Sequence, residues 1–339
     1  MAPSAERKVN FGLIGLGRHG SRYATHLLKD VPQAKLVAVC RRDREQGQAF
    51  AHRHGLIFCS DYHQLIENPG VQAIAIVVSP DLHLDICRHA VAAGKHVLLE
   101  KPLARNLAEG RQLKDLLDNA RIKFMLAQTL RFNSVVREIK RLKDRVGKIH
   151  LAAFNQRMER HKLGWLDDPH VAGGGNILHT GVHIFDLIHF LLEEEVEWAW
   201  CRTGRVYHQR TEDIFAALLG LEMGKTICLV DSCKVTGGRS GRIELVGERG
   251  QLVGDHVLGT LIHIEDRRAV SLELPSSVHT VQKVLEAFAN CILDDQTPSI
   301  TAQDGLRTLR VAEMCYRSAQ NGMVAKRRSY LNEGNIESK

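Results

Sequence analysis

Six residues near the start of the chain form a glycine motif suited to binding phosphate groups. Residues 15–20, GLGRHG, fit the pattern GxGxxG, follow the apolar run 8–14 directly and open a predicted helix. That context is the one that the motif requires. Gly15 permits a tight turn, Gly17 lets the backbone approach a pyrophosphate, and Gly20 lets the helix pack against the strand. Free N–H groups at the helix N-terminus would face the phosphates, so the motif predicts a bound dinucleotide.

The end of the next apolar strand bears on which dinucleotide is bound. Such folds usually end this strand with Asp or Glu, which accepts a hydrogen bond from the ribose 2′-hydroxyl of NAD. Here VAVC is followed by Arg41, Arg42 and Asp43. An arginine would pair with the 2′-phosphate of NADP, which a carboxylate would repel. We therefore expect NADP to be preferred, with NAD as the alternative because Asp43 could still reach the ribose.

Alternating strands and helices must position these residues in the first part of the chain. Short β-branched or apolar runs alternate with amphipathic segments that end at glycine or before turn residues, as in a parallel, doubly wound sheet. The predicted strands are 8–14, 34–40, 57–60, 71–79, 96–100 and 123–128. The predicted helices are 21–29, 62–66, 82–93 and 107–120, and 49–54 is predicted as the end of a further helix. We expect a dinucleotide-binding Rossmann domain over 7–129.

The second part of the chain has a different pattern. Longer strands with partial alternation are predicted at 149–156, 226–235, 242–246, 251–253 and 261–265, with a helix at 181–192. Two amphipathic helices, 279–293 and 302–320, close the chain. This pattern predicts an α/β domain over 130–339 with a largely antiparallel sheet. The C-terminal helices could return to pack on the first domain.

Composition and charge exclude several classes of protein. The 339 residues are 44% hydrophobic and 25% charged, as in globular proteins with a core. No apolar run is long enough to cross a bilayer, and the start, MAPSAERKVN, lacks a signal peptide's apolar core. The eight cysteines form no CxxC pair, which favours free thiols in the cytoplasm. Despite the net charge of +7, no aromatic residues interleave with the basic clusters, so we expect no nucleic-acid partner.

Three segments of the chain carry recognisable motifs: the glycine motif at 15–20, AGKHVLLEKPLA at 93–104 and AGGGNILHTGVHIFDLIHFL at 172–191. Together they resemble the glucose–fructose oxidoreductase/inositol dehydrogenase family, also called Gfo/Idh/MocA. The first segment fits the family's first loop, the second is close to its AGKHVxxEKP, and the third resembles its GGGxxxDxGxHxxD segment. The resemblance covers nearly the whole chain. It implies a Rossmann domain followed by an α/β domain with a large open-faced sheet.

The resemblance implies roles for one lysine and one histidine. Lys101 follows a predicted strand, at the end where doubly wound sheets place ligands. It could stabilise the developing alkoxide of a reacting hydroxyl. His183 aligns with the family's catalytic histidine, and a histidine suits proton transfer at neutral pH. Without the motif, either residue would more often be structural.

One position departs from the family pattern. Where the family usually has Asp, this chain has His179. A neutral histidine would not keep a neighbouring histidine charged, so the mechanism or substrate could differ, or His179 could itself transfer the proton. His179 and His183 are four residues apart, which would place them on one helix face. Two such histidines can bind zinc, but no third ligand stands out, and we expect no metal.

Further positions complete the expected site. We expect the dinucleotide to contact Gly15, Gly17, Arg18, His19, Gly20, Arg41, Arg42, Ser79, His83, Glu100, Lys101 and Gln128. On the substrate side the resemblance implies Arg131, Trp165 and Asp186. Arg131 could hold substrate oxygens or form an ion pair between domains, and Trp165 could cover the substrate or pack within its loop.

The leading interpretation is an NAD(P)-dependent dehydrogenase or reductase acting on a sugar, cyclitol or sugar-acid derivative. Family members suggest two alternatives. One is an enzyme that retains its dinucleotide and cleaves glycosidic bonds through transient oxidation, for which the change at His179 leaves room. The other is a regulator that senses dinucleotide without catalysis, against which Lys101 and His183 argue. Because open sheets pair in this family, we expect a homodimer or homotetramer.

Overall fold

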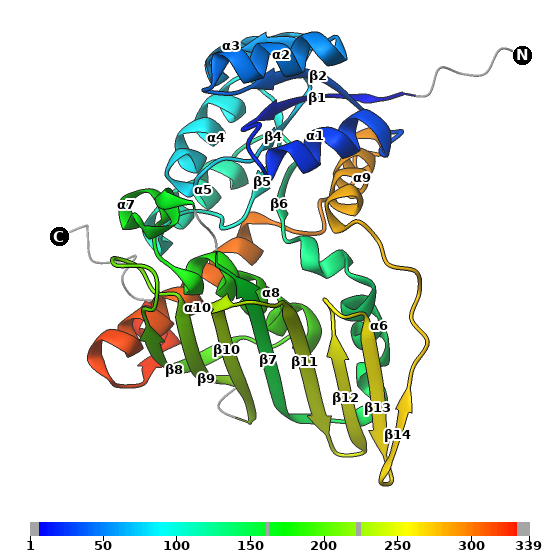
Figure 1. Cartoon of the computed structure of the whole chain (residues 1–339), viewed down its shortest axis with the longest axis vertical. Helices are drawn as coiled ribbons and strands as arrows, with labels where there is room; N and C mark the ends of the chain where they lie inside the picture. Colours follow the sequence, from blue (N-terminus) through cyan, green and yellow to red (C-terminus); the bar gives the residue numbers. More distant parts are fainter. Residues whose placement is uncertain (1–6, 161–162, 222–224, 331–339) are drawn as a thin grey trace, which may run out of the picture. The chain divides into compact units, whose positions relative to one another are not determined.

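The computed structural model describes residues 7–160, 163–221 and 225–330 (Figure 1). Contacts divide the chain into two compact units. The first contains the described residues through Ala104, Ala108–Thr129 and His279–Leu306. The second contains Arg105–Leu107, Leu130–Val278 and the described residues from Arg307 onward. Residues 1–6, which belong to the segment used above to argue against a signal peptide, lie outside the described residues.

The first unit is built on a six-stranded parallel sheet, as predicted. The strand order is β3-β2-β1-β4-β5-β6. All strands are parallel, but the chain adds β2 and β3 on one side of β1 and β4 to β6 on the other, so the order of the strands reverses between β1 and β4. Doubly wound sheets bind ligands outside the carboxyl ends of the strands at such a reversal. Its strands are β1 (Val9–Ile14), β2 (Ala34–Cys40), β3 (Ile57–Cys59), β4 (Ala73–Ile76), β5 (His96–Glu100) and β6 (Phe124–Ala127).

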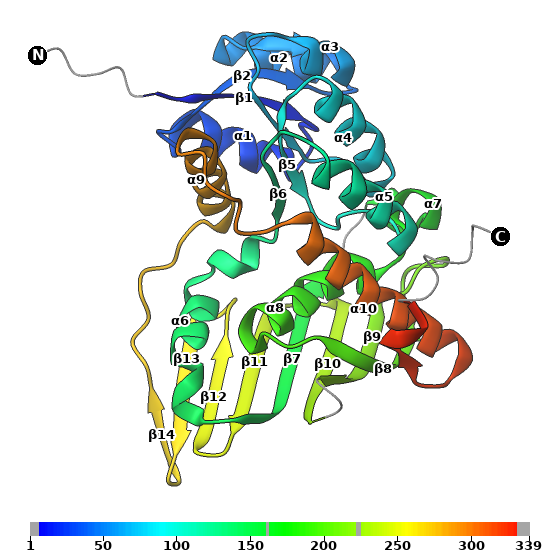
Figure 2. The ribbon, with the colours of Figure 1, turned by 180° about the vertical axis from the view of Figure 1, so that it is seen from behind.

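Helices lie on both faces of this sheet (Figures 1 and 2). They are α1 (Gly20–Lys29), α2 (Arg44–His54), α3 (Tyr62–Glu67), α4 (His83–Ala92), α5 (Leu107–Asp118) and α9 (Thr280–Leu293). α2 ends at His54, as predicted, and begins at Arg44, where the Asp43 side chain accepts a hydrogen bond from the Gln46 N–H and so caps the helix. α9, which is distant in sequence, packs against α1 and β1 through buried residues such as Phe288.

The second unit contains a nine-stranded sheet that is antiparallel except where β7 pairs with β10. The order is β14-β13-β12-β11-β7-β10-β9-β8-β15. The strands are β7 (Ile149–Glu159), β8 (Val196–Gly204), β9 (Ile214–Leu221), β10 (Thr226–Thr236), β11 (Ser240–Gly247), β12 (Gly250–Asp255), β13 (Thr260–Glu265), β14 (Arg268–Ser271) and β15 (Ala325–Lys326). The predicted class, a Rossmann sheet followed by a mostly antiparallel α/β domain, is confirmed.

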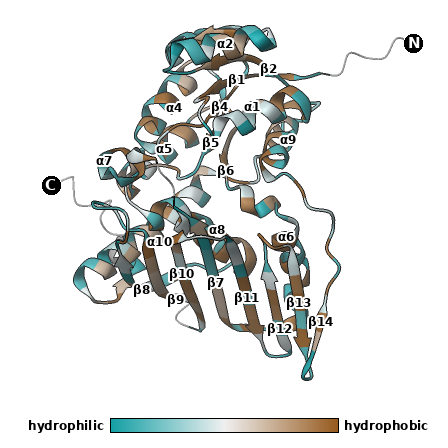
Figure 3. Ribbon diagram, viewed as in Figure 1, coloured by the Kyte–Doolittle hydropathy of each residue, from teal (hydrophilic) through white to brown (hydrophobic). Residues whose placement is uncertain are grey.

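Helices cover one face of the nine-stranded sheet and leave the other open. The helices of this unit are α6 (Ser134–Leu142), α7 (Pro169–Ala172), α8 (Val182–Leu192) and most of α10 (Ala302–Asn321). α8 contacts β7, and α6 contacts β12 and β13. Side chains alternate along a strand, so Ala152 and Phe154 are buried while Leu151 is 37% exposed. Several of these strands carry hydrophobic stretches, drawn in brown in Figure 3. On β10, Ile227 and Leu229 are exposed.

The sequence patterns did not predict every strand. β8 and β9 were missed because neither shows a clean period of two. β9 reads IFAALLGL, an apolar run that periodicity alone cannot distinguish from a buried helix. β14 and β15 are short edge strands of four and two residues. Within the described residues, no helix is both long and apolar enough to cross a membrane.

Candidate active site

The glycine motif forms a tight loop between β1 and α1. Gly15 has a φ of 97°, and a Cβ there would lie 2.1 Å from the carbonyl oxygen of Val77. A Cβ on Gly20 would lie 1.7 Å from the carbonyl oxygen of Gly15. Both positions therefore require glycine for the loop itself to form. A Cβ on Gly17 would meet nothing within 4 Å, so the backbone there is open to an approaching ligand.

Arg41 lies beside the start of this loop. Its Nη1 donates to the carbonyl oxygen of Leu16 at 2.8 Å, and its Nη2 donates to Gln46 Oε1 at 2.5 Å. Asp43 accepts from the Gln46 main-chain N–H at 3.0 Å and from its Nε2 at 2.6 Å. The Asp43 carboxylate is thus engaged at the start of α2, while the Arg41 guanidinium stands at the carboxyl end of β2.

Glu100 and Lys101 follow β5 at the same edge of the sheet. Glu100 is 5% exposed, and its carboxylate accepts from Tyr23 Oη at 2.6 Å, from His19 Nε2 at 2.8 Å and from Lys101 N at 3.0 Å. Burial raises the pKa of Glu100, but the charge and hydrogen bond of His19, the charge of Lys101 and the hydroxyl of Tyr23 together lower it to about 2. Burial lowers the pKa of Lys101, and the Glu100 charge partly offsets this.

Three other predicted dinucleotide contacts also follow strands of this sheet. Ser79 follows β4 and precedes a short 3₁₀ turn, Pro80–Leu82. His83 is fully buried, with Nδ1 3.0 Å from the carbonyl oxygen of Pro102 and Nε2 3.3 Å from that of Val78. Its ring therefore supports the segment after Lys101, whose peptide bond to Pro102 is cis. Gln128, after β6, is 1% exposed, and its amide atoms have no hydrogen-bond partner in the described part of the chain.

The predicted histidines lie in the second unit, at the start of α8. The helix begins at Val182 and is preceded by a π-helical turn, Ile177–Gly181, that contains His179. The expectation that both histidines lie on one regular α-helix is corrected accordingly. A π-helical turn closes i→i+5 hydrogen bonds, so four residues span slightly less than one turn there. His179 is 8% exposed, and its ring packs edge-on against Trp165 with 5.3 Å between centroids.

Two residues that the sequence patterns missed hold the glycine-rich segment before this turn. The Glu212 carboxylate accepts from Gly175 N at 3.1 Å, Ile177 N at 2.9 Å and Tyr316 Oη at 2.9 Å. A Cβ on Gly175 would lie 2.2 Å from the Glu212 carbonyl oxygen, and one on Gly174 would lie 2.0 Å from Tyr316 Oη. The glycines are needed because Glu212 and Tyr316 approach the backbone so closely. Burial raises the pKa of Glu212, which those hydrogen bonds partly oppose.

Arg131 and Asp186, both predicted to contact substrate, bind each other. Arg131 Nε donates to Asp186 Oδ2 at 2.8 Å, and Nη2 donates to Oδ1 at 2.6 Å. Their side chains are 10% and 2% exposed. This two-pronged ion pair joins the segment after β6 to α8 one turn beyond His183. Both residues belong to the second unit.

Comparison with known proteins agrees with these features. The family model for the NAD-binding Rossmann fold of the Gfo/Idh/MocA oxidoreductases matches residues 9–128, and the model for the C-terminal alpha/beta domain matches 140–326. This chain belongs to the Gfo/Idh/MocA oxidoreductase family. It is therefore an NAD(P)-dependent oxidoreductase with the two domains that its sequence pattern predicted.

Individual members of the Gfo/Idh/MocA family match along almost their full length. The chain is 26% identical to scyllo-inositol 2-dehydrogenase (NAD(+)) of Bacillus subtilis, covering 94% of this chain and 96% of that protein. It is 25% identical to 1,5-anhydro-D-fructose reductase of Ensifer adhaerens, covering 93% and 98%. The crystal structure of aldose-aldose oxidoreductase from Caulobacter crescentus has the same fold, with a TM-score of 0.84 at 22% identity, covering 94% and 100%.

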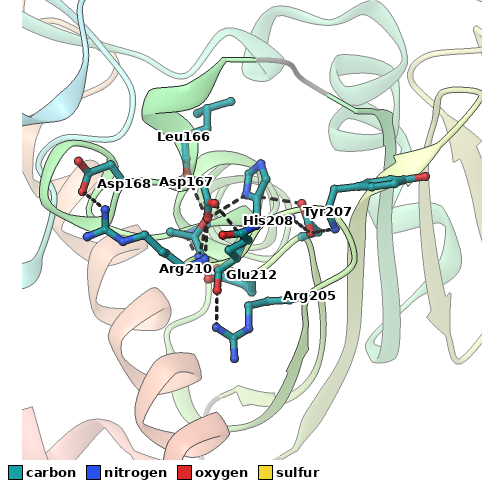
Figure 4. Close-up of polar contacts among 12 residues, drawn as sticks. Leu166, Asp167, Asp168, Arg205, Tyr207, His208, Arg210 and Glu212 are labelled. Carbon is teal, nitrogen blue, oxygen red and sulfur yellow. Dashed lines mark hydrogen bonds and ion pairs between the residues drawn. The ribbon is translucent and has the colours of Figure 1, made fainter.

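In this Gfo/Idh/MocA protein, a compact loop binds Asp167 (Figure 4). Asp167 belongs to the short 3₁₀ turn Gly164–Asp167, which also contains Trp165. Asp167 accepts from the main-chain N–H groups of Gln209, Arg210 and Thr211, each at 2.9 Å. Asp213 accepts from three more, Val206, Tyr207 and His208, at 2.8–2.9 Å.

The His208 ring lies between these two carboxylates. Its Nδ1 is 2.9 Å from Thr211 Oγ1 and 3.5 Å from the nearer oxygen of Asp213. The loop between β8 and β9 is therefore tied to the turn that holds Trp165 against His179. Among the described residues, no group of three or more His, Cys, Asp or Glu side chains is placed to hold a metal ion.

Proposed function

We propose that this enzyme transfers hydride between a nicotinamide and a hydroxyl or carbonyl carbon of a sugar, cyclitol or sugar-acid derivative. The observation that carries the proposal is the position of Lys101, which follows β5 at its carboxyl end and is next to the ionised Glu100. Relatives named for inositol and anhydrosugar substrates, at about 25% identity, support this class of substrate.

The residues of the first unit fit a dinucleotide. Gly17 leaves the loop backbone open at the start of α1, and the buried Gln128 amide has donors and an acceptor to offer. When bound, the dinucleotide supplies the acceptor or donor of hydride. Lys101 donates a hydrogen bond to the reacting oxygen and stabilises negative charge there, and His183 takes or returns the hydroxyl proton.

We propose NADP as the preferred dinucleotide. Arg41 presents a guanidinium at the end of β2, where a 2′-phosphate would lie, and Asp43 is occupied by Gln46. Binding of NADPH and NADH, followed by fluorescence, tests this directly. Tighter binding of NADPH is expected, and NADH binding tenfold more tightly would contradict it.

The substrate class is tested by the absorbance of reduced nicotinamide. The protein is mixed with NADP or NAD and a panel of sugars, cyclitols and sugar acids, beside Lys101→Met. We expect reduction that the variant lacks. If both dinucleotides bind yet no member of the panel reduces either one, the proposed substrate class is wrong.

His179, at the position of the family's Asp, favours one second candidate. This is a redox-assisted glycosidase or lyase that keeps its dinucleotide bound. Tightly retained dinucleotide in the purified protein, with release of an alcohol and no net reduction, would select it over the dehydrogenase.

We also propose a cytoplasmic homodimer or homotetramer. Support for the compartment comes from the eight cysteines, all free thiols and seven of them buried. The open face of the second sheet exposes Leu151, Ile227 and Leu229, which favours a contact with another copy. Light scattering at micromolar concentration tests the assembly, and a monomer would contradict it.

A further inference from the structure

The Glu100 carboxylate joins the glycine loop to Lys101. Its Oε1 accepts two hydrogen bonds from the start of α1, from Tyr23 Oη at 2.6 Å and from His19 Nε2 at 2.8 Å. Its Oε2 accepts from Lys101 N at 3.0 Å. Since a carboxylate only accepts, His19 carries its proton on Nε2 in this pair. One buried anion thus links two segments that are about 80 residues apart in sequence.

The two donors differ in a way that matters for function. Tyr23 is fully buried, and its hydroxyl is fixed on Glu100. The His19 side chain is 45% exposed and belongs to the glycine loop itself. The two rings meet edge-on, 5.5 Å apart and 80° between planes. Tyr23 therefore anchors the carboxylate from within the unit, whereas His19 connects it to the loop where a pyrophosphate would bind.

Burying the ionised Glu100 carboxylate costs free energy of folding. Ionised groups are unfavourable in the interior unless they are paired, and an apolar side chain would pack without that penalty. Here the anion lies directly before the residue whose ammonium the proposed function uses. The titratable groups around it in this unit are His19, Tyr23, Lys101 and His83. Among these, only Lys101 is assigned to the reacting oxygen.

We propose that Glu100, held by Tyr23 and His19, is a positioning residue that fixes the Lys101 backbone and sets the electrostatic surroundings of its side chain. Tyr23 and His19 are then positioning residues that act through Glu100, and His19 ties Lys101 to the glycine loop. This rests on the proposed function in assigning Lys101 to the reacting hydroxyl. Beyond that function, the proposal says that the position and electrostatic surroundings of Lys101 depend on His19 of the glycine loop, through Glu100.

The first test reads the Lys101 ammonium without any substrate. The rate at which a small acylating reagent modifies Lys101 is followed against pH by peptide mass spectrometry. Glu100 raises the pKa of Lys101, so Glu100→Gln should move the reactivity midpoint to lower pH. Tyr23→Phe leaves Glu100 ionised in this pH range, so it should move the midpoint much less than Glu100→Gln. The matched control is Tyr62→Phe, which removes a hydroxyl bound to Asp85 on the surface of the same unit and should leave the curve unchanged.

The second test separates binding from turnover. Tyr23→Phe should lower kcat about tenfold, because Glu100 loses one charge-assisted hydrogen bond that holds it against Lys101, with little change in the Kd of NADPH. His19→Ala should lower kcat and weaken dinucleotide binding. His19→Gln, which keeps a donor, should recover most of the kcat. Thermal unfolding identifies any variant that does not fold.

The outcomes distinguish this proposal from the proposed function. Identical Lys101 reactivity curves in folded wild type, Glu100→Gln and Tyr23→Phe would overturn the role of Glu100. An equal fall in kcat for Tyr62→Phe and Tyr23→Phe would also overturn it. Shifted curves in a protein that turns over no sugar-like substrate would support the link to Lys101 and count against the substrate class.

Discussion

Asp167→Asn is expected to loosen the loop that supports Trp165. Asp167 Oδ1 accepts from Arg210 N and Thr211 N, and Oδ2 accepts from Gln209 N. Asparagine retains one acceptor and turns an amide toward the remaining N–H. Partial burial raises the pKa of Asp167, but the main-chain hydrogen bonds and the His208 charge lower it from 3.8 to about 2.

The size and pH range of the effect follow from that pKa. A fall from 3.8 to about 2 corresponds to about 2 kcal/mol of stabilisation by the ionised carboxylate. Because 26% of the side chain is exposed, solvent screening reduces this to about 1–2 kcal/mol. The pKa is lower in the folded state, so the contribution is present above about pH 5 and is lost as the pH falls toward about 2.

Hydrogen exchange of peptides covering residues 205–213 measures this local stability. At neutral pH, Asp167→Asn should speed exchange of the Gln209, Arg210 and Thr211 amides about tenfold. The difference from wild type should shrink as the pH approaches about 2. Asp115→Asn, the same change at an exposed position on α5, serves as the control. Unchanged exchange in Asp167→Asn, or equal acceleration by the control, would refute the reasoning.

Three further substitutions test other parts of the site. Arg41→Ala should weaken NADPH binding about 10- to 100-fold and leave NADH binding nearly unchanged, whereas an equal loss for both would remove Arg41 from dinucleotide selection. Gly175→Ala should destabilise the protein by about 2–3 kcal/mol in urea unfolding, because its Cβ would lie 2.2 Å from the Glu212 carbonyl oxygen. Gly237→Ala, with open space around it, should be neutral. Asp186→Asn should cost about 3–5 kcal/mol by leaving the Arg131 guanidinium buried without its carboxylate, and a change in KM alone would instead assign the pair to substrate.

The first unit could be predicted in detail because its features are local in sequence. Gly15 and Gly20 are required because a Cβ would clash with the carbonyl oxygens of Val77 and Gly15, respectively. The spacing of the glycines alone indicates the turn. The parallel strands are continuous apolar runs separated by short connections. The start of α2 at Arg44 was not predicted, because Asp43, which caps the helix, was considered as a ribose ligand instead.

The second unit was predicted less completely because its important contacts span long stretches of chain. Glu212 binds Gly175 N across 37 residues, and Tyr316 reaches Glu212 across 104. Neither residue has a neighbouring pattern that would single it out. The glycine triplet did carry a signal, since three glycines before a helix indicate that something approaches the backbone closely. A search for a buried carboxylate able to accept the freed N–H groups is the step that would have led from those glycines to Glu212.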